Sequence, residues 1–162
     1  MRSIDDFTRP KEYLSPLDDI LGQIIRQWAE KYVIPYRRSF DEDWEEHRLI
    51  EPAFDILMGE LGLQRVLFPE EYGGWGLGHS NYAGTAAYRL MEEISRADSA
   101  MGVAFGVVFW PLIMICNEPH VNHRLCEEFA PMFCNTRKAV FAANAMTEPQ
   151  GGADIENLEI VR

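Results

Sequence analysis

Residues 145–154, with the sequence AMTEPQGGAD, have the residue types of a turn that could hold a nucleotide. A strand that ends at Met146 would leave backbone N–H groups and the Thr147 hydroxyl available to a planar ligand with carbonyl acceptors. Pro149 stiffens the turn, and the two following glycines allow the backbone to approach a pyrophosphate. Two interpretations stay open from these residues alone: a nucleotide-cofactor turn, and an ordinary β-turn that Asp154 caps.

A second group of residues has the chemistry of zinc ligands. Cys116, His120, His123 and Cys126 place two thiols and two imidazoles within eleven residues. Their spacing is not that of a familiar zinc finger, and both cysteines fall on apolar faces of expected helices. We therefore favour buried thiols with exposed histidines, and we predict no metal site.

Helical periodicity dominates the first half of the chain. Ser15 is a suitable N-cap for a helix with apolar residues at helical spacing as far as Tyr32, before Pro35 intervenes. Residues 37–51 are densely charged and predict a solvated connection with Trp44 as its large anchor. Pro52 then opens a second helix, whose expected C-terminal glycine follows at position 62.

The second half begins with three further expected helices. Asn81 can cap the third, residues 100–116 form an apolar fourth, and a short fifth runs from about Asn122 to Ala130, before Pro131 ends it. From Lys138 onwards the residues become small, apolar and partly alternating, a pattern typical of a strand. A domain boundary is therefore predicted near Lys138.

Composition limits the classes of partner. The 162 residues include 26 acids and 15 bases, a net charge of −11 that argues against binding nucleic acid or anionic lipid. Three cysteines and charged residues near the N-terminus favour a cytoplasmic chain without a signal peptide. Residues 99–118 approach membrane-spanning length, but Gly102, Gly106 and Pro111 favour a buried helix, so we expect no membrane span.

Three segments together resemble the acyl-CoA dehydrogenase family in order and spacing. They are residues 61–78 (LGLQRVLFPEEYGGWGLG), 88–107 (YRLMEEISRADSAMGVAFGV) and 145–154. The family signature TEPxxGxD is matched by Thr147, Glu148, Pro149, Gly152 and Asp154. The resemblance covers nearly the whole chain.

The resemblance implies a mainly α fold. Residues 1–137 would form the N-terminal helical-bundle domain of the family, and residues 138–162 the first strands of a truncated middle β-domain that carries the FAD-binding loop. In this family a C-terminal helical bundle follows, and FAD lies between the domains.

The resemblance also implies a cofactor, FAD, and a substrate, an acyl-CoA thioester. Met146 and Thr147 would meet the flavin ring, and a donor such as Thr147 stabilises negative charge on the reduced flavin. Gly152 and Ala153 would lie beside the pyrophosphate of FAD and the pantetheine of the substrate. The implied sites comprise cofactor-binding Asn144, Ala145, Met146, Thr147, Gly152 and Ala153, and substrate-binding Ala153, Phe105, Val108, Phe109 and Leu112. Residues of the fourth helix could equally be ordinary core.

Two positions depart from the family pattern. Ala153 stands where the family usually has Ser or Thr, so one side-chain hydrogen bond is absent, and Gln150 replaces a common glycine. The carboxylate that removes the α-proton, while flavin N5 accepts the β-hydride, belongs to a C-terminal segment in the family. We therefore expect no catalytic base in this chain.

The leading hypothesis is the N-terminal part, or one subunit, of an FAD-dependent acyl-CoA dehydrogenase that is inactive alone. A complementary subunit or a missing C-terminal region would supply the rest of the β-domain and the helices of a hetero-oligomer. An electron-transfer acceptor would receive the electrons. Two alternatives stay open: a non-catalytic scaffold or binding subunit of the same fold, and a flavin oxidase or monooxygenase of the same superfamily.

Overall fold

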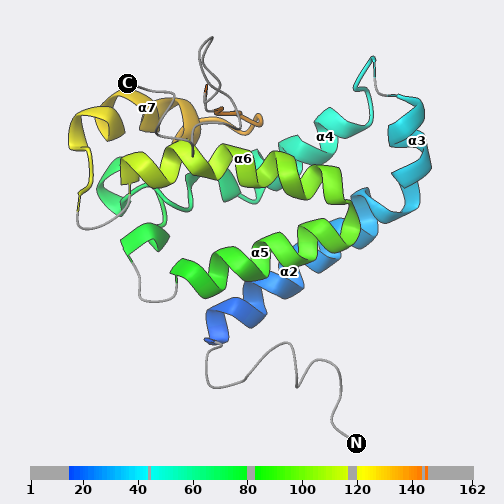
Figure 1. Ribbon diagram of the computed structural model, residues 1–162, viewed down its shortest axis with the longest axis horizontal. Coiled ribbons are helices and arrows are strands. Elements are labelled where there is room, and N and C mark those ends of the chain that lie inside the picture. Colours follow the sequence, from blue (N-terminus) through cyan, green and yellow to red (C-terminus); the bar gives the residue numbers. More distant parts are fainter. Residues whose placement is uncertain (1–14, 44, 80–82, 117–119, 144, 146–162) are drawn as a thin grey trace, which may run out of the picture.

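The computed structural model describes residues 15–43, 45–79, 83–116, 120–143 and 145, and these residues form a bundle of helices (Figure 1). The α-helices are α2 (Pro16–Tyr32), α3 (Arg37–Glu42), α4 (Ile50–Phe54), α5 (Ala83–Ala97), α6 (Ser99–Cys116) and α7 (His123–Cys134). Short 3-10 helices cover Ile34–Tyr36, Leu63–Arg65, Glu70–Tyr72 and Leu77–His79. The mainly helical fold class is thus confirmed for this part of the chain.

Helix α2 begins as the sequence predicts. The Ser15 hydroxyl accepts from Asp18 N–H at 3.3 Å, and Asp18 Oδ2 accepts from Ser15 N–H at 2.6 Å. This reciprocal capping box satisfies two N–H groups at the start of the helix. Leu21, Ile25 and Trp28 then lie on its buried face. Trp28 Nε1–H donates to the carbonyl oxygen of Ala53 at 3.1 Å, which joins α2 to α4.

The charged connection contains more helix than expected. Residues 37–42 of the expected solvated connection form α3, and Trp44 lies outside the described residues. The Arg37 guanidinium donates to the carbonyl oxygens of Ala97 and Arg96 at the end of α5. These two carbonyl groups lie at the C-terminus of α5, where they lack intrahelical partners, and the Arg37 guanidinium satisfies them. The contact favours α3 because it holds Arg37, the first residue of that helix, against α5.

The second expected helix begins at Ile50, two residues before Pro52, which fits the first turn because its missing N–H has no intrahelical partner there. The helix continues as a π-helical segment, Asp55–Glu60. It ends at Glu60, and the predicted C-terminal glycine, Gly62, follows with a φ of 75° in the left-handed region.

Helices α5 and α6 form the centre of the bundle. Figure 1 shows α5 beside α2 and below α6, and both pairs are in contact. Helix α6 is long and apolar enough to span a bilayer, but Met101, Phe105 and Leu112 are among seven of its residues buried in the core. These residues pack one side of α6 into the core, whereas Val103, Trp110 and Met114 are exposed. Asn81, the expected cap of α5, lies outside the described residues.

Helix α7 begins as predicted and ends later. The Asn122 side chain accepts from Leu125 N–H at 3.2 Å, as an N-cap does. Pro131 lies inside the helix, which runs to Cys134, so the predicted end at Pro131 was wrong. The Phe133 ring packs on Phe68 with centroids 5.6 Å apart, and this burial stabilises the last turn beyond the proline.

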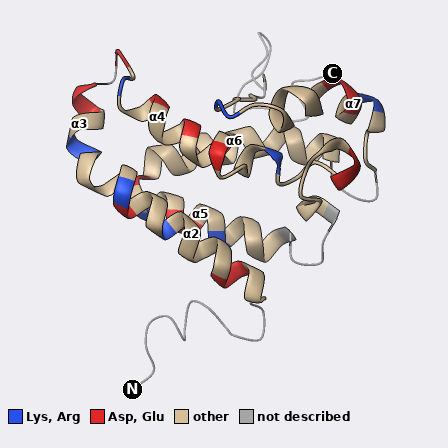
Figure 2. Ribbon diagram, turned by 180° about the vertical axis from the view of Figure 1, so that it is seen from behind, with Lys and Arg blue, Asp and Glu red and all other residues tan. Residues whose placement is uncertain are grey.

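A carboxylate at the centre of an arginine cluster joins α2 to α5. Glu93, with a fully buried side chain, accepts from Arg26 at 2.6 Å, Arg89 at 2.7 Å and Arg96 at 2.9 Å. Figure 2 shows basic and acidic residues together where these two helices meet. Burial raises the pKa of Glu93, but hydrogen bonds from Arg26 and Arg96 and the charge of Arg89 outweigh it and lower this pKa to about 2.

The predicted strand at Lys138 is not seen in the part of the chain that is described. Residues 138–143 have no regular secondary structure, and residues 146–162 lie outside the description. A strand requires a partner to accept its backbone hydrogen bonds, and residues 138–140 instead bond to side chains of the helical domain. The domain boundary near Lys138 stays a prediction.

Candidate functional site

The site is built on residues 135–143, the segment that leads from α7 towards the AMTEPQGGAD motif. Gln64, which is buried, holds this segment at three points. Its Nε2 donates to the carbonyl oxygens of Phe133 at 2.9 Å and Lys138 at 3.2 Å, and its Oε1 accepts from Val140 N–H at 2.9 Å. One amide side chain therefore fixes the course of the segment on both sides of Lys138.

Asp55 holds the same segment from the π-helical turn. Its Oδ1 accepts from Ala139 N–H at 2.8 Å, and its Oδ2 accepts from Lys138 Nζ at 2.6 Å. Partial burial raises the pKa of Asp55, but the hydrogen bonds from Lys138 and Ala139 outweigh it and lower this pKa below its ordinary value. The carboxylate is thus ionised at neutral pH and engaged by Lys138 and Ala139.

Gly59 allows the segment to approach the π-helical turn closely. A Cβ atom built at this position would lie 2.0 Å from the carbonyl oxygen of Arg137. No side chain fits at that distance, because the opposing atom belongs to the backbone and cannot rotate away. The absence of a side chain at position 59 is therefore a condition for this packing.

We expect Gly59→Ala to lower the free energy of unfolding by about 1–3 kcal/mol, the usual cost of overpacking. Gly84→Ala on α5 is the matched control, since a Cβ there meets nothing within 4 Å and alanine has the higher helix propensity. Urea denaturation of both variants measures the difference, and amide exchange at Ala139 and Val140 should accelerate only in the first. Equal stability of the two variants would contradict this packing.

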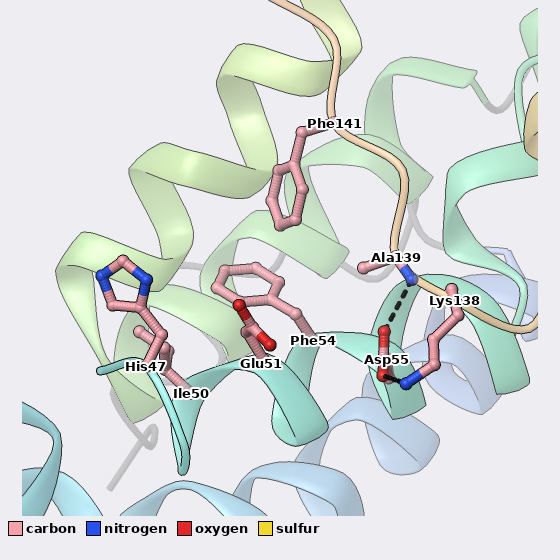
Figure 3. Close-up of a pocket in the computed structure, with 8 residues that line it drawn as sticks. All are labelled: His47, Ile50, Glu51, Phe54, Asp55, Lys138, Ala139 and Phe141. Carbon is pink, nitrogen blue, oxygen red and sulfur yellow. Dashed lines mark hydrogen bonds and ion pairs between the residues drawn. The ribbon is translucent and has the colours of Figure 1, made fainter. Parts of the chain in front are cut away.

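A cleft of about 510 Å³ opens between α4 and this segment (Figure 3). In Figure 3 the Phe141 ring lies over Phe54, and their centroids are 5.1 Å apart in an edge-to-face arrangement. Ile50 adds to the apolar wall, while His47 and Glu51 line the side away from Lys138. Phe141 is 54% exposed although it is aromatic and central to this wall.

The cleft is suited to apolar contact and to positioning. Asp55 and Lys138 form its ion pair, and Ile50, Phe54 and Phe141 give it an apolar wall. None of the residues lining it is a cysteine, serine or threonine. Its contacts therefore hold Lys138 and Ala139, which precede the motif in the sequence, and leave an apolar surface beside them.

The flavin-contacting residues inferred by resemblance fall mostly outside the described part of the chain. Ala145 is described, exposed and in no helix or strand, whereas Asn144, Met146, Thr147, Gly152 and Ala153 are not described. Their assignment stays a prediction, and we derive no reaction step from a flavin site.

The inferred acyl-binding residues are described and share one environment. Phe105, Val108, Phe109 and Leu112 are all buried in the core, and the Phe105 and Phe109 rings lie 4.4 Å apart. They do not line the cleft of Figure 3. Their role as the wall of an acyl pocket stays a prediction.

Three residues of this site, Asp55, Gln64 and Phe141, received no role from the sequence analysis. Asp55 and Lys138 are 83 positions apart, so no local pattern connects them. Gln64 did carry a signal, because a polar amide within the apolar stretch LGLQRVLF requires hydrogen-bond partners if it is buried.

The histidines and cysteines considered for zinc divide into two groups. Cys116 and Cys126 are buried with sulfur atoms 3.9 Å apart. His123 Nδ1 instead lies 2.9 Å from the Tyr72 hydroxyl on an exposed side. Burial and the neighbouring Cys126 raise the pKa of Cys116 far above its ordinary value, which keeps it a thiol. The described residues contain no cluster of three or more groups that could hold a metal ion.

Comparison with known proteins shows similarity to one family. The chain is 27% identical over 160 residues to a mitochondrial isovaleryl-CoA dehydrogenase of Pongo abelii, covering 91% of this chain and 35% of that protein. It is 31% identical over 138 residues to a mitochondrial isovaleryl-CoA dehydrogenase of Solanum tuberosum, covering 83% and 30%. A mitochondrial short-chain specific acyl-CoA dehydrogenase of Bos taurus is 39% identical over 89 residues, covering 54% and 19%.

The extent of these matches defines what the chain contains. It spans about a third of the length of the curated relatives it matches. No solved structure matches it significantly. The family model of the acyl-CoA dehydrogenase N-terminal domain matches residues 18–131, which are most of the chain and include α5, α6 and nearly all of α2. The chain therefore belongs to the acyl-CoA dehydrogenase family, of which it carries the N-terminal helical domain.

Proposed function

We propose that this chain is the N-terminal part of a flavin-dependent acyl-CoA dehydrogenase, which desaturates an acyl-CoA thioester between its α and β carbons. The helical domain supports this role by positioning the motif segment. The observation that carries the proposal is the threefold attachment of residues 133–140 to Gln64, next to the TEPQGGAD sequence.

The chemistry divides between this chain and the remainder of the enzyme. Bound FAD would supply the hydride acceptor, and a carboxylate outside this chain would take the α-proton. Thr147 would donate to the pyrimidine edge of the flavin, and Gly152 would allow close backbone approach. The remaining β-domain and C-terminal helices would come from a second chain or from a longer form of this one.

Asp55 and Gln64 have a positioning role under this proposal. Their hydrogen bonds hold Lys138, Ala139 and Val140 against the helical domain, four to six residues before the predicted flavin contacts, which begin at Asn144. Such prior ordering lowers the entropy lost when a ligand binds to the motif. The exposed ring of Phe141 and the apolar cleft beside it suit contact with the completing β-domain.

The experiment is to co-express this chain with a neighbouring reading frame that encodes a β-domain and C-terminal helices of the family. Flavin absorbance of the purified complex, and reduction of that absorbance by an acyl-CoA, are the expected results. Thr147→Val should weaken flavin retention, whereas Thr85→Val on α5 is the control that leaves it unchanged. A colourless complex, or a chain that purifies alone as a stable monomer and ignores the partner, would overturn the proposal.

A further inference from the structure

A second cavity, of about 590 Å³, is lined in part by residues 134–137 and is polar. The residues that line it include Arg65 and Arg137, together with Asn135 and Thr136. It shares none of its lining residues with the cleft of Figure 3. We propose that this cavity is a binding site for a phosphate monoester, held by Arg65 and Arg137.

The two arginines have no acidic partner in the described part of the chain. Arg26, Arg48, Arg89 and Arg96 all form ion pairs with carboxylates. Arg65 and Arg137 form none there, although the chain has 26 acidic residues against 15 basic ones. Two unpaired guanidinium groups on one cavity of an acidic protein are a local concentration of positive charge that favours an anion.

Arg65 also has an unsatisfied donor. Its Nε atom is buried and has no hydrogen-bond partner among the described residues. A buried donor without a partner costs about 1–3 kcal/mol, so such an atom calls for a missing acceptor. The guanidinium carbon lies 6.0 Å from the centroid of the Trp75 ring, a cation–π contact that limits its movement. Cys134 lines the same cavity as Arg65. Burial raises the pKa of the Cys134 thiol, and the charge of Arg65 partly opposes this rise.

The loop that carries the other donors is held at both ends. Gln64 Nε2 bonds to the carbonyl oxygens of Phe133 and Lys138, which flank residues 134–137. Within the loop, the Thr136 hydroxyl accepts from Lys138 N–H at 3.1 Å and is still able to donate. A ligand therefore meets a largely ordered wall and loses less conformational entropy on binding.

The donor set favours a phosphate over a carboxylate. Two guanidinium groups, a hydroxyl and an amide provide more donors than the two oxygens of a carboxylate can accept, whereas a phosphate offers three acceptor oxygens beyond its ester oxygen. The volume lies within the usual range for small-molecule sites, so the cavity has room for the organic part of an ester. Glu60 also lines the cavity and reduces its positive charge. The proposal requires neither flavin nor thioester.

The test is calorimetric titration of the purified chain with inorganic phosphate and with phenyl phosphate, at constant ionic strength. Saturable binding is expected, tighter for the ester. Arg137→Gln, at an exposed position, and Arg65→Met should each weaken binding by about tenfold or more, the loss of one charge-assisted hydrogen bond. Glu60→Gln should tighten it. Arg124→Gln, at the opposite end of α7, is the charge-matched control and should leave the affinity unchanged.

Three outcomes would overturn the site. Binding that does not saturate, or that weakens equally in Arg124→Gln and Arg137→Gln, means that the anion acts only through general charge screening. Benzoate binding as tightly as phenyl phosphate would exclude the phosphate class. If Arg65→Met fails to fold, the phosphate affinities of the Arg137 and Glu60 variants still test the site. Thermal unfolding monitored by circular dichroism shows whether those two variants are folded.

Discussion

Glu93→Gln is expected to lower the free energy of unfolding by about 3–5 kcal/mol, the usual cost of removing one partner from a buried charge cluster. The variant keeps the shape of the side chain but removes the charge that Arg26, Arg89 and Arg96 share. Arg89 should contribute most to this loss of stability, because its side chain is only 7% exposed and water cannot replace the charge that its guanidinium loses. Urea denaturation followed by circular dichroism measures the loss.

Glu92→Gln is the matched control. Glu92 pairs with the same Arg89 at 2.6 Å, but its side chain is 25% exposed and lies at the edge of the cluster. Its replacement should cost about 1 kcal/mol or less, in the range of solvated pairs. Equal losses of stability in the two variants would show that the buried Glu93 contributes no more than the partly exposed Glu92.

The same carboxylate predicts how stability depends on pH. The pKa of Glu93 is about 2 in the folded chain against an ordinary value of 4.5, so folding favours the ionised form. Its contribution is therefore fully present above pH 4.5 and is lost as the pH falls through about 2. Acid titration of the free energy of unfolding should show this decline in the natural chain and a shallower one in Glu93→Gln. Identical profiles would contradict the assigned pKa.

Gln64→Leu is the second large prediction, with an expected loss of about 2–3 kcal/mol in the free energy of unfolding. Leucine preserves much of the volume but leaves the carbonyl oxygens of Phe133 and Lys138 and the N–H of Val140 without the side-chain partner they now have. Those groups cannot all reach water without moving residues 133–140. Hydrogen exchange at Val140 should therefore accelerate more than exchange in α2 or α5.

Gln27→Leu, on the exposed face of α2, controls for the change from amide to aliphatic side chain and should be nearly neutral. Under the proposed function, the completed enzyme with Gln64→Leu should also retain less flavin than the one with Gln27→Leu. If stability falls but flavin retention is unchanged, Gln64 serves only the packing of the helical domain. If neither changes, its three hydrogen bonds have no positioning role.

Local signals in the sequence were sufficient for most helices. Ser15 and Asn122 supply caps, and Gly62 supplies the left-handed residue that ends a helix, so each acts through groups within a few positions. Differences arose where distant contacts outweigh local preference. Pro131 does not end α7, because Phe133 is buried on Phe68, and α3 forms where its Arg37 reaches the end of α5.

The sequence by itself determined the family, the helical class and the motif TEPQGGAD, because residue type and spacing are sufficient for each. Only the tertiary structure placed Gln64 and Asp55 on the segment before that motif, closed Glu93 within three arginines and brought Arg65 to the same cavity as Arg137. These contacts join residues separated by as many as 84 positions, and Arg65 and Arg137 are themselves far apart in the chain. Their energies depend on burial and geometry that exist only once the helices have packed.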